Sequence, residues 1–115
     1  MIPKFRAYDG GSLCRMYSPE EVMVGNGDIW IIDEDGVAGE WIVNNDLALM
    51  QSTGLTDKNG KEIFEGDIID STDGFLTGVV EFRVSLGMFV SELVEYNNFE
   101  RLCNVASSRK IIGNI

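Results

Sequence analysis

Two short acidic runs are the places where this sequence comes nearest to a metal site. Asp33-Glu34-Asp35-Gly36 and Asp57-Lys58-Asn59-Gly60 each place side-chain oxygens two positions apart in front of a glycine, as a calcium loop does at its start. A complete EF-hand loop also needs a bidentate acid at its twelfth position, and the twelfth position counted from Asp57 is Ile68. We therefore interpret both runs as hairpin turns, and we expect no metal ion or other cofactor.

Arrangements for catalysis are equally incomplete. Asp70, Glu81 and Arg83 imitate the Asp…Glu-x-Lys pattern of metal-dependent nucleases, but arginine stays protonated where that chemistry uses a lysine. The chain has no histidine, so no serine or cysteine has a histidine base. The glycine pair in Gly25-Asn26-Gly27 is too short for a phosphate loop and is typical of a turn. The sequence therefore predicts a protein that is not an enzyme.

The two cysteines, Cys14 and Cys103, lie far apart in the chain. They do not make a disulfide framework, and they cannot supply four zinc ligands. We expect reduced thiols, one or both of them buried. No apolar stretch is long enough to span a bilayer, and the N-terminus lacks the apolar region of a signal peptide, so a cytoplasmic protein without membrane contact is expected.

The charge balance restricts the classes of partner. Of 115 residues, 19 are acidic and 9 basic, which gives a formal charge of −10, and from Gly25 to Asp57 there is no lysine or arginine at all. Binding of duplex nucleic acid needs a surplus of basic residues, so that function is disfavoured. An apolar content of 44% argues against disorder. The acidic balance instead favours a basic partner.

The elements predicted for the first half are short strands separated by turns. Lys4–Tyr8 alternates polar and apolar residues, and 13–17 returns as a second strand. Ser18-Pro19-Glu20-Glu21 has the cap, proline and acids of a helix start, with room for about one turn. Ile29–Ile32 and Trp41–Val43 are predicted to form a hairpin. Its tryptophans, Trp30 and Trp41, either pair across the strands as core or anchor an interface.

The second half shows a similar spacing of short apolar runs, which is typical of a small barrel. The segment 47–51 fits a helix or a strand, and Asn59-Gly60 is the strongest hairpin signal of the chain. A short helix fits 98–106, before a last strand at 110–115. The side chains expected inside the barrel are Phe64, Ile68, Val79, Phe82 and Phe89. The same aromatic residues, with Phe75, leave open the binding of a single nucleic-acid strand on the barrel face.

Three blocks of the sequence resemble one family. They are Lys4-Phe5-Arg6-Ala7-Tyr8-Asp9, the long block from Leu49 to Ile69 with M-Q-S-T-G-L-T-D-K-N-G-K-E-I-F-E-G-D-I-I, and Ile111-Ile112-Gly113-Asn114-Ile115. Together they resemble the YopX family of phage and prophage proteins. The resemblance implies a mainly β protein with at most short helices: an N-terminal β arm or small sheet over 1–53 and an SH3-like barrel over 54–115. The family signature, interpreted as a turn and strand block, comprises Gly54, Leu55, Asp57, Asn59, Gly60, Gly66 and Asp67.

The resemblance implies homo-oligomerisation but no known activity. We therefore expect a non-catalytic accessory protein that acts through protein–protein contacts, with itself and with a host or phage protein. An isolated hairpin is only marginally stable in water, so the first half must pack on the barrel or on another subunit. The candidate interface residues are Phe5, Tyr8, Trp30 and Trp41. The alternatives are an acidic DNA mimic that inhibits a host nucleic-acid-binding protein, and a single-strand binder.

Overall fold

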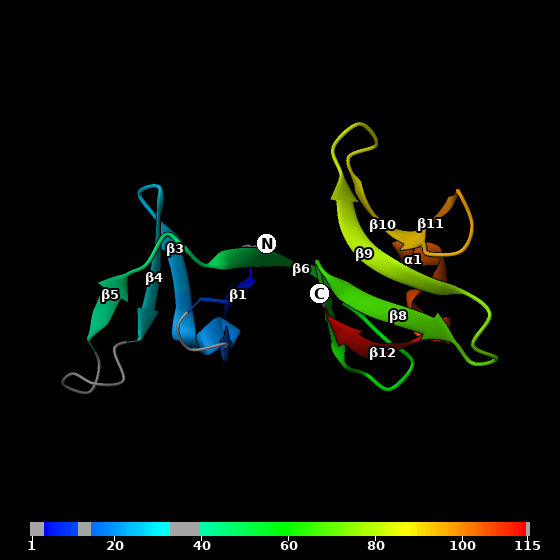
Figure 1. Ribbon diagram of the computed structural model, residues 1–115, viewed down its shortest axis with the longest axis horizontal. Coiled ribbons are helices and arrows are strands. Elements are labelled where there is room, and N and C mark those ends of the chain that lie inside the picture. The colour runs from blue at the N-terminus through cyan, green and yellow to red at the C-terminus, as the bar shows by residue number, and fades with distance from the viewer. Residues whose placement is uncertain (1–3, 12–14, 33–39, 115) are drawn as a thin grey trace. The chain divides into compact units, whose positions relative to one another are not determined.

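The computed structural model describes residues 4–11, 15–32 and 40–114 (Figure 1). The chain divides into two compact units, Met1–Gln51 and Ser52–Ile115, and the strand β6 (Ala48–Thr56) runs from the first into the second. Strands dominate both units, as the sequence predicts. Among the described residues, no helix has the length and apolar character that crossing a membrane requires.

The first unit contains a sheet in which β1 (Phe5–Asp9) lies between β2 (Arg15–Tyr17) and the first half of β6. Both pairings are antiparallel, so the segment 47–51 resolves to a strand rather than a helix. After β2 comes a single 3₁₀ turn, η1 (Pro19–Glu21). The amide of Ser18 donates to the Glu21 carboxylate at 3.0 Å, which is the reciprocal half of a capping box. The predicted short helix is therefore confirmed as one turn.

A three-stranded sheet follows, in the order β3 (Val22–Gly25), β4 (Asp28–Ile32) and β5 (Trp41–Val43). The turn between β3 and β4 consists of Asn26 and Gly27, whose φ angles are 53° and 80°. Positive φ at both central residues is the geometry of a type I′ hairpin turn, which asparagine and glycine adopt at least cost. The pairing of β4 with β5 confirms the predicted hairpin.

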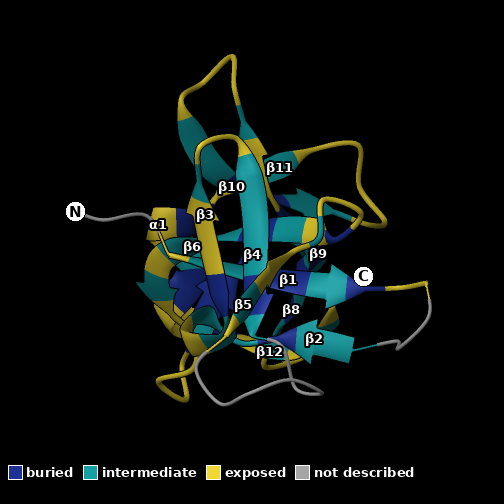
Figure 2. Ribbon diagram, turned by 90° about the vertical axis from the view of Figure 1, so that its left-hand side faces the viewer, coloured by how far each residue is buried: buried dark blue, intermediate teal, exposed yellow. Residues whose placement is uncertain are grey.

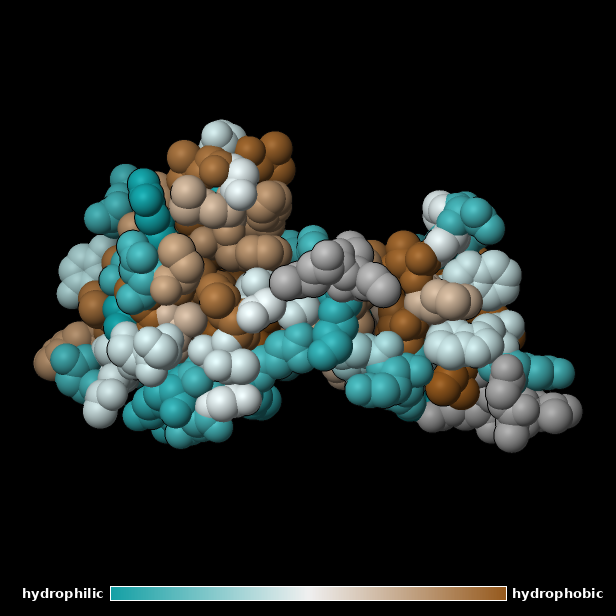
Figure 3. Space-filling view, turned by 180° about the vertical axis from the view of Figure 1, so that it is seen from behind, coloured by the Kyte–Doolittle hydropathy of each residue, from teal (hydrophilic) through white to brown (hydrophobic). Residues whose placement is uncertain are grey.

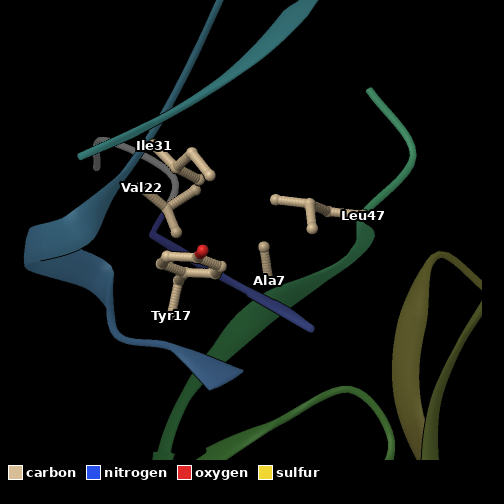
Figure 4. Close-up of a cluster of buried hydrophobic side chains, with 5 residues drawn as sticks. All are labelled: Ala7, Tyr17, Val22, Ile31 and Leu47. Atoms are coloured by element: carbon tan, nitrogen blue, oxygen red, sulfur yellow. The ribbon is translucent and has the colours of Figure 1, made fainter. Parts of the chain in front are cut away.

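The core of the first unit is small (Figure 4). Its buried side chains are Ala7, Tyr17, Val22, Ile31 and Leu47, contributed by both sheets and the segment before β6. Phe5, Ile29 and Leu49 pack against this cluster from its margin. One face of β4 therefore supplies the core, while its other face points away from it.

The second unit is a curled five-stranded sheet that fits a small β barrel (Figure 1). Its order is β11 (Phe99–Arg101), β10 (Met88–Leu93), β9 (Thr77–Arg83), β8 (Asp67–Ser71) and β12 (Arg109–Asn114). The short strand β7 (Glu62–Phe64) pairs with the second half of β6. Of the short helix expected over 98–106, the second half is confirmed as α1 (Leu102–Val105) and the 3₁₀ turn η2 (Ala106–Ser108), while Phe99–Arg101 form the strand β11 instead. The core consists of Ile63, Ile69, Val80, Leu102 and Ala106.

The prediction of the barrel interior is wrong for some of its side chains. Phe64 is buried, as expected, but Phe82 is 40% exposed at the edge of the core, where its ring lies 5.0 Å from that of Phe89. In β8 and β9 the wholly buried apolar side chains are Ile69 and Val80, and their predecessors Ile68 and Val79 are only half-buried on the opposite face. A shift of one residue moves every side chain of a strand to the other face.

The prediction that one or both cysteines are buried now rests on Cys14, because the described cysteine, Cys103, is exposed. Cys103 is a free thiol on the exposed side of α1, because the helix turns Leu102 and Ala106 toward the core instead. Cys14 lies outside the described residues.

Candidate functional site

The three-stranded sheet of the first unit has an apolar outer face. Because Ile31 points into the core, the neighbouring positions Trp30 and Ile32 lie on the opposite side of β4. The strand register places Met23 and Val43 beside Trp30, and Trp41 beside Ile32. We call this surface the apolar face, and it consists of Met23, Trp30, Ile32, Trp41 and Val43.

The apolar face is open to a considerable extent. Met23 is 48% exposed and Val43 is 44% exposed, while the two tryptophans and Ile32 are half-buried. Figure 2 shows exposed residues on β3 and β5 on either side of the intermediate β4. In the space-filling view, hydrophobic atoms reach the surface of both units (Figure 3). An apolar sheet face that carries tryptophan at this exposure is typical of a protein–protein contact surface.

The strand register differs from the predicted cross-strand pair of Trp30 and Trp41. Trp30 lies directly opposite Val43, and Trp41 lies directly opposite Ile32. The two indoles are therefore diagonal neighbours on one face, and not a directly opposed pair. Neither belongs to the buried cluster of Figure 4, which lies on the other side of β4.

The two outer strands of this sheet are apolar. Both outer strands, β3 with the sequence VMVG and β5 with WIV, lack charged residues and proline. Natural proteins usually place charges, prolines or bulges on edge strands to prevent pairing with another chain. The edges, like the face, therefore favour association.

The other two candidate interface residues lie on β1, on opposite faces of its sheet. Phe5 shares a face with the buried Ala7 and packs against the core. Tyr8 is half-buried on the other face. Its ring lies close to Gly10, since a Cβ atom added there would be 3.2 Å from it. The structure thus separates these residues from the apolar face, and Trp30 and Trp41 are the pair that it brings together.

The apolar face has an acidic border. Asp28 lies at the start of β4 on the same side as Trp30, and it accepts a hydrogen bond of 2.9 Å from the side-chain amide of Asn45. Glu40 and Asp46 are exposed on either side of β5. No lysine or arginine occurs anywhere from residue 16 to residue 57, so nothing in the sheet neutralises these carboxylates.

The sequence block from Leu49 to Ile69 contains a buried carboxylate, that of Asp57, in the second unit. We call this carboxylate and its hydrogen bonds the clasp. The Asp57 carboxylate is buried, with 5% of the residue exposed, and it accepts hydrogen bonds from three backbone amides. One oxygen takes those of Asn59 and Lys61, both at 2.9 Å, and the other takes that of Ile111 at 3.1 Å. The carboxylate therefore holds the hairpin turn to the C-terminal strand β12.

The pKa of Asp57 decides whether the carboxylate of the clasp is charged. Burial acts to raise the pKa of Asp57, but the amide hydrogen bonds from Ile111, Lys61 and Asn59, with the charge of Lys61, lower the pKa below its usual 3.8. Asp57 is therefore ionised at neutral pH, and its hydrogen bonds are charge-assisted.

The remaining signature residues are also structural. Gly54, Gly60 and Gly66 have φ angles of 77°, 80° and 84°, which L-residues rarely adopt. Leu55 packs against the core, and the buried Asp67 accepts the amide of Phe64 at 2.8 Å. The side chain of Asn59 is exposed. Turn chemistry explains the block, as the sequence indicates.

The candidate metal and nuclease residues do not assemble into a site within the described residues. No group of three acidic or cysteine side chains there is arranged to hold a metal ion, and Asp33 and Asp35 lie outside the described ranges. Arg83 is engaged by Glu81 at 3.3 Å and by Glu92, and it stacks 4.4 Å from the Phe99 ring centre. Asp70 accepts the Thr77 hydroxyl at 3.0 Å.

Comparison with known proteins gives one family. The model of the YopX protein family matches residues 4–115. Among solved structures, protein EF1440 from Enterococcus faecalis has a TM-score of 0.63 at 27% identity, over 100% of this chain and 94% of the other. YopX from Bacillus subtilis has a TM-score of 0.58 at 19% identity, over 96% and 91%. No curated protein matches the sequence.

Proposed function

The chain belongs to the YopX family, and from this premise we propose that it works without catalysis, as a homo-oligomeric accessory protein that acts through protein–protein contacts. The apolar face carries this proposal. A small sheet with Trp30 and Trp41 on one side and a thin core on the other gains more from contact with another protein than from exposure to water. The proposal places the protein in the cytoplasm of a host cell as a phage-encoded component.

Light scattering coupled to size exclusion tests the oligomer. We expect a mass that is a multiple of 12.7 kDa at micromolar concentration and moderate salt. Val43→Glu introduces a charge at an exposed position directly opposite Trp30, and it should lower the mass toward that of the monomer. Phe75→Glu is the matched control, since Phe75 is 72% exposed in the second unit and should leave the mass unchanged. A wild-type monomer at every dilution would refute the proposal.

The acidic stretch favours one alternative, an inhibitor that imitates nucleic acid. The observation behind it is that residues 16–57 contain no lysine or arginine, while Glu40 and Asp46 are exposed. Affinity purification of the tagged protein from its host discriminates the two functions. A DNA mimic should retain a nucleic-acid-binding protein that is released by salt and by competing duplex DNA. Retention of the protein's own copies, unaffected by DNA, supports the oligomeric accessory function instead.

A further inference from the structure

The core of the first unit stops short of the strand β5. On the face of the sheet that bears the core, the register aligns Val22 of β3, Ile31 of β4 and Ile42 of β5 in one row. Val22 and Ile31 are 9% and 3% exposed, while Ile42 is 43% exposed. On the opposite face of β5, Val43 is 44% exposed. Apolar side chains on both faces of β5 are therefore open to water.

One side of the β5 backbone faces away from β4. The amide of Asn44 donates to the carbonyl of Ile29 at 2.9 Å, and the residues of a strand that bond to a given neighbour alternate along an antiparallel pair. Ile42 therefore bonds to β4, and the N–H and C=O groups of Trp41 and Val43 point to the other side. Among the described residues no strand pairs with that side, because β5 ends the sheet (Figure 1). It presents donors and acceptors in the pattern that a further antiparallel strand uses.

A second copy of β5 fits this edge with its backbone and its side chains. In an antiparallel arrangement about a two-fold axis with Ile42 opposite Ile42 of the second copy, Trp41 of each copy lies opposite Val43 of the other. The outward N–H and C=O groups of Trp41 and Val43 then bond to each other, and the two Ile42 residues form the closer, non-hydrogen-bonded kind of pair. Ile42 becomes covered on one face of the sheet and Val43 on the other. The strand is therefore complementary to itself.

Charge does not oppose this register. The strand β5, with the sequence WIV, carries no charge, and the register places the exposed Glu40 opposite Asn44 of the second copy. The two Glu40 residues are then separated along the strands by the length of four residues, about 13 Å. This distance exceeds the screening length of about 8 Å at physiological salt. Asp46 belongs to the turn that follows β5, outside the paired segment.

We propose that two copies of the chain join their β5 strands about a two-fold axis and form one continuous antiparallel sheet with three strands from each copy. This inference rests on the proposed homo-oligomer and identifies the contact that makes it. The apolar faces of the two copies lie on the same side of the joined sheet, because a two-fold axis perpendicular to a sheet preserves its faces. Since copies associate in pairs, the mass of the assembly is an even multiple of 12.7 kDa.

Cysteine cross-linking tests the register. Every variant also carries Cys14→Ser and Cys103→Ser, so that the introduced thiol is the only one. Ile42→Cys places two thiols opposite each other at a Cβ separation of about 4.5 Å, and mild oxidation should convert most of the chain to a covalent dimer. Val43→Cys is the matched control, because Val43 lies opposite Trp41 of the second copy and not opposite its own counterpart. It should give at least about tenfold less dimer.

Proline substitution tests the edge itself. Val43→Pro removes a donor that points away from β4, so the sheet keeps its own hydrogen bonds while the contact loses one from each copy. We expect the concentration of half-assembly to rise at least about tenfold. Val24→Pro is the control on the other outer strand, because Val24 lies opposite Ile29, whose carbonyl faces β5, and its N–H also points away from β4. This variant should assemble normally, and circular dichroism melts confirm that both variants are folded.

Three outcomes overturn the β5 contact while leaving the homo-oligomer intact. One is a wild-type assembly with an odd number of copies, and another is Ile42→Cys that forms no more covalent dimer than Val43→Cys. The third is normal assembly of Val43→Pro, which would leave the edge to an extended segment of a different protein. A wild type that is monomeric at every dilution instead refutes the proposed function itself, so the two failures are distinguishable.

Discussion

Removal of the Asp57 carboxylate is expected to destabilise the second unit strongly. Asp57→Ala leaves the amides of Asn59, Lys61 and Ile111 without their acceptor, and the last of these joins residues 54 positions apart. A hydrogen bond to a charged group contributes about 1.5–3 kcal/mol, and water replaces the acceptor more easily at the exposed turn than at β12. We therefore expect a loss of about 3–4 kcal/mol in the free energy of unfolding.

Urea unfolding followed by circular dichroism measures this loss. With a slope of about 1.5 kcal/mol per molar, the midpoint should fall by about 2–2.7 M while the slope stays constant. Asp57→Asn keeps one acceptor oxygen and should lose about half as much. Asp73→Asn is the control, because Asp73 is exposed and its bond to the amide of Phe75 is local, so its midpoint should stay near wild type. A loss below about 1 kcal/mol for Asp57→Ala would refute the clasp.

The same clasp predicts a dependence on pH. Because the pKa of Asp57 is lowered in the folded protein, its contribution to stability is complete above the ordinary value of 3.8 and is lost as the pH falls through the folded value. The difference in stability between wild type and Asp57→Asn should therefore be constant from pH 7 to pH 5 and shrink below pH 4. A difference that grows in acid would contradict an ionised clasp.

Three further substitutions test other features of the fold. Gly78→Ala would place a Cβ 1.9 Å from the Ser91 hydroxyl and should cost about 1–3 kcal/mol in urea unfolding, with partial recovery when Ser91→Gly is added. Gly27→Ala, at a φ of 80°, should cost about 1 kcal/mol in a thermal melt, because the hairpin turn must keep its positive φ. Arg109→Met removes a nearly buried guanidinium that bonds Glu100 at 2.8 Å, and replacement of both partners by apolar residues should destabilise less than Arg109→Met alone.

Residues close together in the sequence determined the turns of this protein and its construction from short strands. Asn26, Gly27 and Gly60 adopt positive φ because asparagine and glycine tolerate it, and this preference needs no distant partner. The capping of the turn at Ser18 by Glu21 is likewise complete within four residues. The conclusion that the chain is built of short strands, with Asp57 in a turn, follows from such signals alone.

Tertiary structure decided which face of each strand is buried. Ile68 and Ile69 are both apolar, as are Val79 and Val80, so the alternation that assigns faces in other strands is absent here. The bond from the Phe64 amide to the buried Asp67 turns Asp67, and with it Ile69, toward the interior. The second oxygen of Asp57 similarly finds its donor at Ile111, which no local pattern could identify. Trp30 and Trp41 came to share the apolar face only through the register of β4 and β5, because pairing between strands depends on contacts that are distant in the sequence.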